Sequence, residues 1–263
     1  MRILVTNDDG ITSEGLHVLA ERVAALGDVI VVAPSSEFSG AGAAVGPIHL
    51  ALPEVHDAEV KGASTAFTVD GPPALCVFLA RLGAFGEVPD LIVSGVNPGY
   101  NVGRSVYHSG TVGAAVTGRN GGINGVAVSQ GTVAEEPQHW DAAAEVAAWV
   151  AETLLVDLPS EPVVCNVNVP NLPLDQLGEV VHTRIGETPP FATAKAALEP
   201  IGAGRYRVEM TVADPVEQPR DLDTGAVVAG AVSIGWIGPW SEPSPPGHTD
   251  RVLDTVATRL TPT

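Results

Sequence analysis

Short apolar runs alternate, over residues 1–170, with segments in which apolar residues recur at helical spacing. The apolar runs lie at Ile3–Thr6, Val29–Ala33, Pro89–Ser94, Gly125–Ser129 and Val163–Val169. The segments with helical spacing lie at residues 13–26, 74–82 and 140–155. Such short, continuous runs are typical of strands buried on both faces, and strands that alternate with helices build parallel sheets. The pattern predicts an α/β protein with a Rossmann-like fold of three layers around a mainly parallel sheet.

A different pattern begins after residue 178. Val180–Arg184 and Arg205–Val212 alternate apolar and polar residues, which indicates an antiparallel hairpin or arm. Weaker strand signals lie earlier, at Ile48–Leu50 and Ala66–Val69. Near the end of the chain, Thr249–Leu260 has the spacing of a short amphipathic helix.

The chain is strongly acidic. It carries 31 acidic residues against 13 basic ones, which gives a formal net charge of −18 over 263 residues. Such a field repels nucleic acid and anionic membrane surfaces, so the composition argues against both as partners. A small phosphorylated substrate can still bind, because a metal ion and backbone N–H groups reverse the potential locally.

The two cysteines and the apolar stretches indicate the compartment. Cys76 and Cys165 lie within apolar runs, which indicates buried free thiols and neither a disulfide nor a zinc site. The chain enters its first strand after a single basic residue, without the pattern of a signal peptide. The apolar stretches are too short to span a bilayer. We therefore expect a cytoplasmic protein.

Polar loops follow three of the predicted strands, at 7–10, 35–42 and 97–103. Ligands of open α/β sheets bind beyond the carboxyl ends of the strands, where such loops converge. The loops offer the carboxylates of Asp8 and Asp9, the hydroxyl of Ser39 and the amide oxygen of Asn97. This all-oxygen set suits Mg²⁺, Mn²⁺ or Ca²⁺ better than zinc.

The segment Ser109-Gly110-Thr111 resembles the entrance of a helix, where free backbone N–H groups hold anions. Enzymes that transfer a phosphoryl group to water use a divalent cation beside groups that hold the phosphate oxygens. Taken singly, each of these segments is more often an ordinary turn or helix cap. Their convergence on one edge of a sheet favours a joint site.

These motifs, in this order and spacing, resemble the SurE family of survival-protein 5′/3′-nucleotidases. The segments that carry the resemblance are Thr6-Asn7-Asp8-Asp9-Gly10, Val32-Ala33-Pro34 with Ser39-Gly40, Ser94-Gly95-Val96-Asn97 with Gly99, Asn101 and Gly103, and residues 109–115. Residues 166–171, Asp223 and Val232-Ser233-Ile234 are similar to later segments of the family.

The resemblance implies a metal-dependent 5′/3′-nucleotidase that releases phosphate from nucleoside monophosphates, with one Mg²⁺ or Mn²⁺ per subunit. It implies a single domain over residues 1–263, with a Rossmann-like core and metal site at 1–178 and a hairpin arm and C-terminal oligomerisation elements at 179–263. It also implies a homodimer or homotetramer. The implied metal ligands are Asp8, Asp9, Ser39 and Asn97. The implied catalytic residues are Asp8, Asp9, Asn97 and Ser109. The implied phosphate contacts are Asn7, Gly40, Asn101, Ser109, Gly110 and Thr111.

Four positions depart from the family pattern. His108 stands where tyrosine is usual, Thr117 where glutamate is usual, and Pro72 and Leu75 where threonine and aspartate are usual. His108 could donate a proton or simply replace a packing aromatic ring. These changes bear on nucleotide preference more than on metal binding.

Other functions stay open at this stage. One is a nucleotide- or sugar-nucleotide-binding α/β protein of the glycosyltransferase type. Another is a binding or assembly member of the family with weakened catalysis. Within a phosphatase, Asp8 could also act as a covalent nucleophile in place of metal-activated water.

Overall fold

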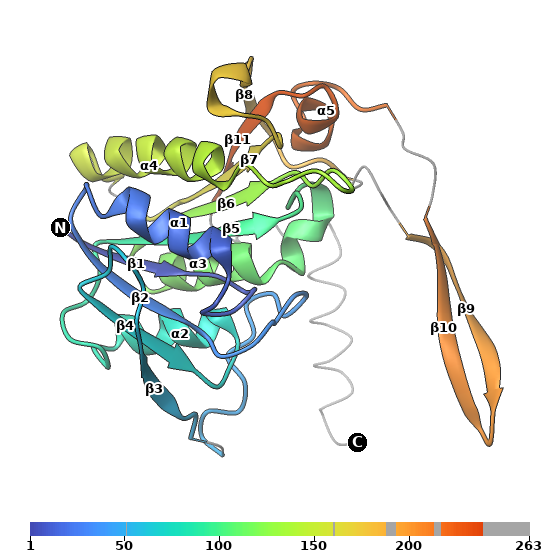
Figure 1. The fold of residues 1–263 in the computed structure, drawn as a ribbon, viewed down its shortest axis with the longest axis horizontal. Coiled ribbons are helices and arrows are strands. Elements are labelled where there is room, and N and C mark those ends of the chain that lie inside the picture. Colours follow the sequence, from blue (N-terminus) through green and yellow to red (C-terminus); the bar gives the residue numbers. More distant parts are fainter. Residues whose placement is uncertain (51, 160, 188–192, 213–216, 239–263) are drawn as a thin grey trace, which may run out of the picture.

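The computed structural model describes residues 1–50, 52–159, 161–187, 193–212 and 217–238. Its centre is a nine-stranded sheet in the order β3-β4-β2-β1-β5-β6-β7-β11-β8 (Figure 1). The strands are β1 Arg2–Thr6, β2 Asp28–Pro34, β3 Val55–Ala58, β4 Thr65–Val69, β5 Leu91–Pro98, β6 Asn124–Gln130, β7 Val164–Val169, β8 Val180–Thr183 and β11 Val232–Ile237. The six neighbouring strands from β4 to β7 pair in parallel, whereas β3 and β11 pair antiparallel with β4 and β7. The predicted α/β fold with a mainly parallel sheet is confirmed.

Helices cover both faces of this sheet (Figure 1). They are α1 Glu14–Val23, α2 Pro73–Arg81, α3 Gly110–Asn120, α4 Trp140–Val156 and α5 Asp223–Val228, with 3₁₀ turns η1 Gly103–Tyr107 and η2 Leu174–Gln176. Successive residues of β1 point to opposite faces, as strand geometry requires. Ile3 and Val5 share a core with α1 and α4, and Leu4 shares a second core with α2. The carboxyl ends of β2, β1 and β5 therefore lie side by side at one edge of a three-layer body.

A separate hairpin projects from this body (Figure 1). Its strands are β9 Thr193–Gly202 and β10 Arg205–Val212, which pair antiparallel. The expected hairpin is present, but the assignment of Val180–Arg184 to it is wrong. Val180–Thr183 forms β8, which pairs in parallel with β11 at the edge of the main sheet. An edge strand with one solvated face shows the same alternation as an arm, so the pattern alone does not separate them.

Three further expectations change. Residues 48–50 form turns and not a strand, whereas Ala66–Val69 does lie in a strand, β4. Asn97 lies inside β5 and not in the loop after it. Strands β8 and β11 belong to the main sheet although both lie after residue 178, where the Rossmann-like core was expected to end.

The cysteines behave as predicted: Cys76 and Cys165 are buried and free. The expected helix Thr249–Leu260 lies outside the described residues. Among the described helices, none combines the length and the apolar character that a membrane span requires.

Candidate functional site

Strand β1 ends in a tight turn that carries Asp8 and Asp9. The Asn7 side chain is buried, and its Nδ2 donates to the Gly10 carbonyl at 3.1 Å, which closes the turn locally. Gly10 has a φ of +98°, and a Cβ there would lie 3.3 Å from the backbone of Ser36. The turn therefore requires glycine and lies directly against the loop after β2.

The amino end of α3 meets the Asp8 carboxylate. Thr111 Oγ1 donates to Asp8 Oδ1 at 2.6 Å, and a Cβ added to Gly110 would lie 2.7 Å from Asp8 Oδ2. Ser109 caps the helix, since its Oγ accepts from the Val112 N–H at 3.1 Å. Burial raises the pKa of Asp8, while the Thr111 hydroxyl and the N–H groups of Thr111 and Gly110 oppose that rise. The structure thus brings the predicted anion cradle against a predicted metal ligand.

The Asp9 carboxylate is half-buried beside two other carboxylates. Burial, together with the negative charges of Asp8 and Glu37, raises the pKa of Asp9 to about 7. Its Oδ2 is buried and has no hydrogen-bond partner among the described residues. The ion pairs in the described part of the chain include neither Asp8 nor Asp9. Arg104, which follows the loop after β5, is exposed. A cation is the group that would satisfy this arrangement.

Asn97 lies at the carboxyl end of β5, next to β1. The two strands pair in parallel up to Ser94, so Asn97 continues β5 at the level where Asp8 leaves β1. The pairing of β5 with β6 shifts between Ser94 and Asn97, and such irregularities redirect side chains at strand ends. Asn97 Nδ2 donates to the Gly99 carbonyl at 2.7 Å, which leaves Oδ1 as a free acceptor for a cation.

Ser39 and Gly40 lie on the exposed loop after β2. Ser39 Oγ donates to Glu37 Oε1 at 2.9 Å, so this hydroxyl is engaged with a carboxylate that the sequence pattern does not single out. Gly40 has a φ of +84° and open space around its Cβ position. The roles of Ser39 as a metal ligand and of Gly40 as a phosphate contact remain predictions.

Asn101 is tied into a buried polar network. Its Nδ2 donates to Ser129 Oγ at 2.8 Å and its backbone N–H to Asn168 Oδ1 at 2.8 Å. Its carbonyl accepts from the side-chain amides of Asn166 and Asn168 at 2.9 and 3.1 Å. The network anchors the loop after β5 to β6 and β7, and a direct contact of Asn101 with phosphate remains a prediction. Asn166 and Asn168 alternate with apolar residues in β7, and this alternation is the sequence feature that could have indicated the anchor.

Asp223 anchors the same loop from the far end of the chain. Its Oδ2 accepts from the Gly103 N–H at 2.9 Å, and its Oδ1 accepts from the N–H groups of Gly186 and Thr224 at 2.8 and 2.7 Å. Asp223 is buried, and its bonds join segments more than 100 residues apart in the sequence. Its positioning role follows from this tertiary contact, and its position in the sequence offers no signal for the role.

Two departures from the family pattern have clear structural places. The His108 side chain is exposed, and its backbone carbonyl accepts from the Gly42 N–H at 3.0 Å. Thr117 lies inside α3, where its Oγ1 donates to the Gly113 carbonyl at 2.8 Å. Thr117 therefore serves its own helix, and His108 has solvent access as a proton donor would need.

The donors at this edge fit a hard divalent cation. Asp8, Asp9 and Asn97 supply carboxylate and amide oxygens, and Asn7 Oδ1 is a further buried oxygen without a hydrogen-bond partner among the described residues. The buried carboxylate of Asp8 and the half-buried carboxylate of Asp9 repel each other, and a bound cation would offset that repulsion. Oxygen ligands of this kind select Mg²⁺, Mn²⁺ or Ca²⁺.

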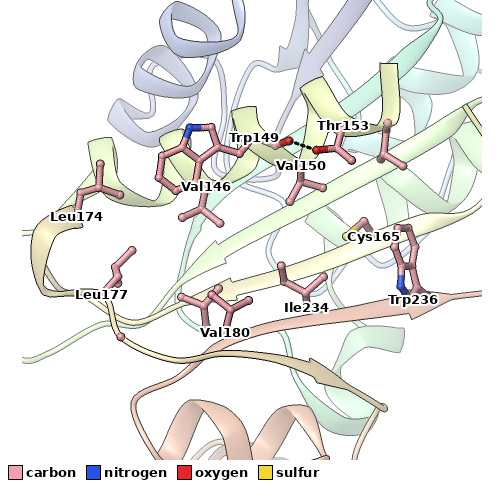
Figure 2. Close-up of a pocket in the computed structure, with 13 residues that line it drawn as sticks. Val146, Trp149, Val150, Thr153, Cys165, Leu174, Leu177, Val180, Ile234 and Trp236 are labelled. Carbon is pink, nitrogen blue, oxygen red and sulfur yellow. Dashed lines mark hydrogen bonds between the residues drawn. The ribbon is translucent and has the colours of Figure 1, made fainter. Parts of the chain in front are cut away.

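An apolar cavity of about 570 Å³ lies elsewhere, between α4, η2, β8 and β11 (Figure 2). Trp149 and Trp236 flank it, and Cys165 lines it from β7. The Thr153 hydroxyl donates to the Trp149 carbonyl at 2.8 Å within the helix, so it is already engaged. Burial raises the pKa of the Cys165 thiol to about 12, which excludes a reactive thiolate. This cavity lacks the groups that the predicted chemistry needs.

Comparison with known proteins agrees with the geometry of the sheet edge. Residues 3–190 match the family described as "Survival protein SurE". The chain belongs to the SurE family. It is 38% identical over 242 residues to the 5′-nucleotidase SurE of Nitrosococcus oceani, covering 89% of this chain and 90% of that protein.

Two further SurE proteins show the same likeness. The 5′-nucleotidase SurE of Carboxydothermus hydrogenoformans is 34% identical over 237 residues, covering 89% of each chain. The crystal structure of the SurE protein from Aquifex aeolicus matches with a TM-score of 0.79 at 26% identity, over 99% of this chain and 100% of that one. The described residues therefore share the fold of a SurE protein.

Proposed function

We propose that this SurE chain is a divalent-metal-dependent phosphomonoesterase, a 5′-nucleotidase that releases phosphate from nucleoside monophosphates. Relatives named 5′-nucleotidase SurE cover 89% of the chain, which supports the substrate class. The observation that carries the proposal is the pair Asp8 and Asp9. The Asp8 carboxylate meets the amino end of α3 through Thr111, and Asp9 Oδ2 has no hydrogen-bond partner among the described residues. A cation site beside the backbone N–H groups of a helix start is what phosphoryl transfer to water requires.

One Mg²⁺ or Mn²⁺ per subunit would be held by Asp8, Asp9 and Asn97, with Ser39 as a further ligand. When bound, the ion supplies Lewis-acid chemistry, because it withdraws charge from the phosphoryl group and favours water as the nucleophile. Asp8 is kept in place for this role by the Thr111 hydroxyl at 2.6 Å.

The other site residues would hold the phosphate. Ser109 Oγ already accepts from the Val112 N–H, so its own proton is available for a phosphate oxygen. The N–H groups of Gly110 and Thr111 lie at the positive end of the α3 dipole, where an oxyanion is favoured. Asn7, Gly40 and Asn101 are proposed as further contacts around the phosphate.

The test is steady-state phosphate release from AMP by the full chain, with Mn²⁺ or Mg²⁺ and with EDTA. We expect activity with either metal and none with EDTA. Asp8→Asn and Asp9→Asn should lower kcat by more than about 100-fold while the circular dichroism spectrum stays native. Substantial metal-dependent activity in either variant would contradict the assignment of these two aspartates.

The alternatives predict different results in the same assay. A sugar-nucleotide-binding protein or a catalytically weakened family member would release no phosphate from AMP under any metal condition. A covalent mechanism would leave a phosphoaspartate on Asp8, which rapid acid quenching and mass spectrometry would detect. We expect no such adduct, because the oxygen-ligand set and the helix end already provide for attack by water.

The assembly is proposed to be a homodimer or homotetramer in the cytoplasm. Both strands of the hairpin expose large apolar side chains, which a second copy of the chain could cover. These residues are Leu198, Ile201, Tyr206, Val208 and Met210. Light scattering coupled to size-exclusion chromatography would give the subunit number, and a monomer at micromolar concentration would contradict the proposal.

A further inference from the structure

A second groove, of about 440 Å³, lies where the loop after β2 faces the start of α2. Its apolar lining includes Phe38 from the loop after β2, Ile48 from the following turns, and Pro72 and Leu75 from the start of α2. Its lining also includes the carboxylate-bearing residues Glu54 and Asp70. These two are held together, since the Asp70 N–H donates to the Glu54 carbonyl at 3.0 Å.

Backbone hydrogen bonds place this groove beside the metal and phosphate site. The Phe38 N–H donates to the Asp8 carbonyl at 2.7 Å, so the residue that lines the groove also contacts the turn of the aspartate pair. The Ser35 N–H donates to the Val69 carbonyl at 3.0 Å, which joins the start of the same loop to the residue before Asp70. The groove therefore extends from the phosphate end of the site toward the Asp70 turn.

The chemistry of the groove matches a nucleoside. The Phe38 side chain is half-buried, lines the groove, and is not part of the hydrophobic clusters among the described residues, so its ring is the aromatic surface that the groove offers to a ligand. A base offers flat apolar faces for an aromatic ring, and a ribose offers hydroxyl donors for a carboxylate. His56 Nε2 lies 3.6 Å from Glu54 Oε2 and 3.9 Å from Asp70 Oδ2, so at most one positive charge faces these two carboxylates. This end of the groove therefore does not favour a phosphate, which fixes the direction in which a nucleotide can lie.

We propose that this groove binds the nucleoside part of the substrate, with the base on Phe38 and a ribose hydroxyl donating to Asp70. This assignment rests on the proposed nucleotidase function and names the residues that would select nucleotides over other phosphomonoesters. Pro72 and Leu75 line this groove and carry no polar side-chain atoms, so its wall at the start of α2 is apolar.

The decisive experiment compares nucleoside and phosphate recognition in Phe38→Ala. Stacking of a base on an aromatic ring is worth roughly a 10-fold change in affinity or more. We expect the KM for AMP to rise about 10-fold while kcat changes less than about threefold, since uniform binding is lost. The inhibition constant of inorganic phosphate, which needs the phosphate end alone, should stay unchanged. Phe38→Trp, which keeps a flat ring, should restore the KM.

A second variant tests the ribose contact without touching the loop beside Asp8. Asp70→Asn should lower kcat/KM for AMP about fivefold, and this loss should disappear with 2′-deoxy-AMP or 3′-deoxy-AMP, because one of these lacks the donor. If the phosphate inhibition constant of Phe38→Ala rises as much as its KM for AMP, the groove assignment is overturned. It is also overturned if Phe38→Ala and Asp70→Asn both keep the wild-type kcat/KM for AMP. Absence of AMP hydrolysis in the wild type itself would instead refute the nucleotidase proposal.

Discussion

Replacing Asp9 by asparagine should make the metal-free protein more stable at pH 8. The pKa of Asp9 rises from its ordinary value of 3.8 to about 7 on folding, because burial and the charges of Asp8 and Glu37 disfavour the carboxylate. The folded state therefore binds a proton more tightly than the unfolded state between these two values. The contribution of Asp9 to stability is therefore most favourable below about pH 4, falls as the pH rises through 7, and is least favourable above pH 7.

The size of the effect follows from the same shift. A rise from 3.8 to about 7 corresponds to at most ~4 kcal/mol for a fully buried group. Asp9 is partly accessible to water, so screening reduces the expected penalty to ~1–2 kcal/mol. For a chain of this length that is a difference in Tm of roughly 2–6 °C.

The assay is thermal unfolding of wild type and Asp9→Asn from pH 5 to pH 8 in EDTA, repeated with saturating Mn²⁺. In EDTA we expect Asp9→Asn to have the higher Tm at pH 8 and the gap to close toward pH 5. With the metal at about 100 times its dissociation constant, the wild type should gain ~2.7 kcal/mol and the variant much less, which reverses the order.

A matched control separates the site from the general acidity of the protein. Asp57→Asn removes one negative charge from the exposed edge strand β3, away from the aspartate pair. It should change the pH dependence little and leave the response to Mn²⁺ intact. Identical melting temperatures of wild type and Asp9→Asn at pH 8 in EDTA, with identical responses to metal, would refute the reasoning.

Three further substitutions test the contacts around the site. Thr111→Val removes the 2.6 Å hydrogen bond to Asp8, so kcat/KM for AMP should fall roughly 10–100-fold, while Thr111→Ser keeps the hydroxyl and most of the activity. Gly110→Ala places a Cβ 2.6 Å from Asp8 Cβ and should abolish phosphate release, whereas Gly178→Ala meets nothing within 4 Å and should be neutral. Asp223→Asn replaces one of the two carboxylate oxygens by an NH₂ donor, so at least one of the three bonded backbone N–H groups loses its acceptor. The free energy of unfolding in urea should fall by ~1–3 kcal/mol, and an unchanged midpoint would contradict the anchoring role.

Much of the core could be predicted from the chain alone, because the parallel strands are buried on both faces. The runs around Ile3 and Val29 are continuous and apolar, the run around Val163 is interrupted by Asn166 and Asn168, and each becomes a strand of the main sheet. The Asp8 turn could be predicted for the same local reason, since polar residues end a buried strand abruptly. Strands with one solvated face are harder to assign from the sequence. The prediction placed β8 in the hairpin because an edge strand and an arm show the same alternation of apolar and polar residues.

By itself the sequence determined the α/β class, the family and the residues that end β1 and begin α3, because these depend on local patterns. The tertiary structure alone decided which of those residues meet. It places the α3 end against Asp8 through the Thr111 hydroxyl, engages Ser39 with Glu37 and Asn101 with Ser129, and joins Asp223 to the loop after β5. Such contacts span up to 120 residues, and no local pattern encodes a distance between segments that only the packed sheet brings together.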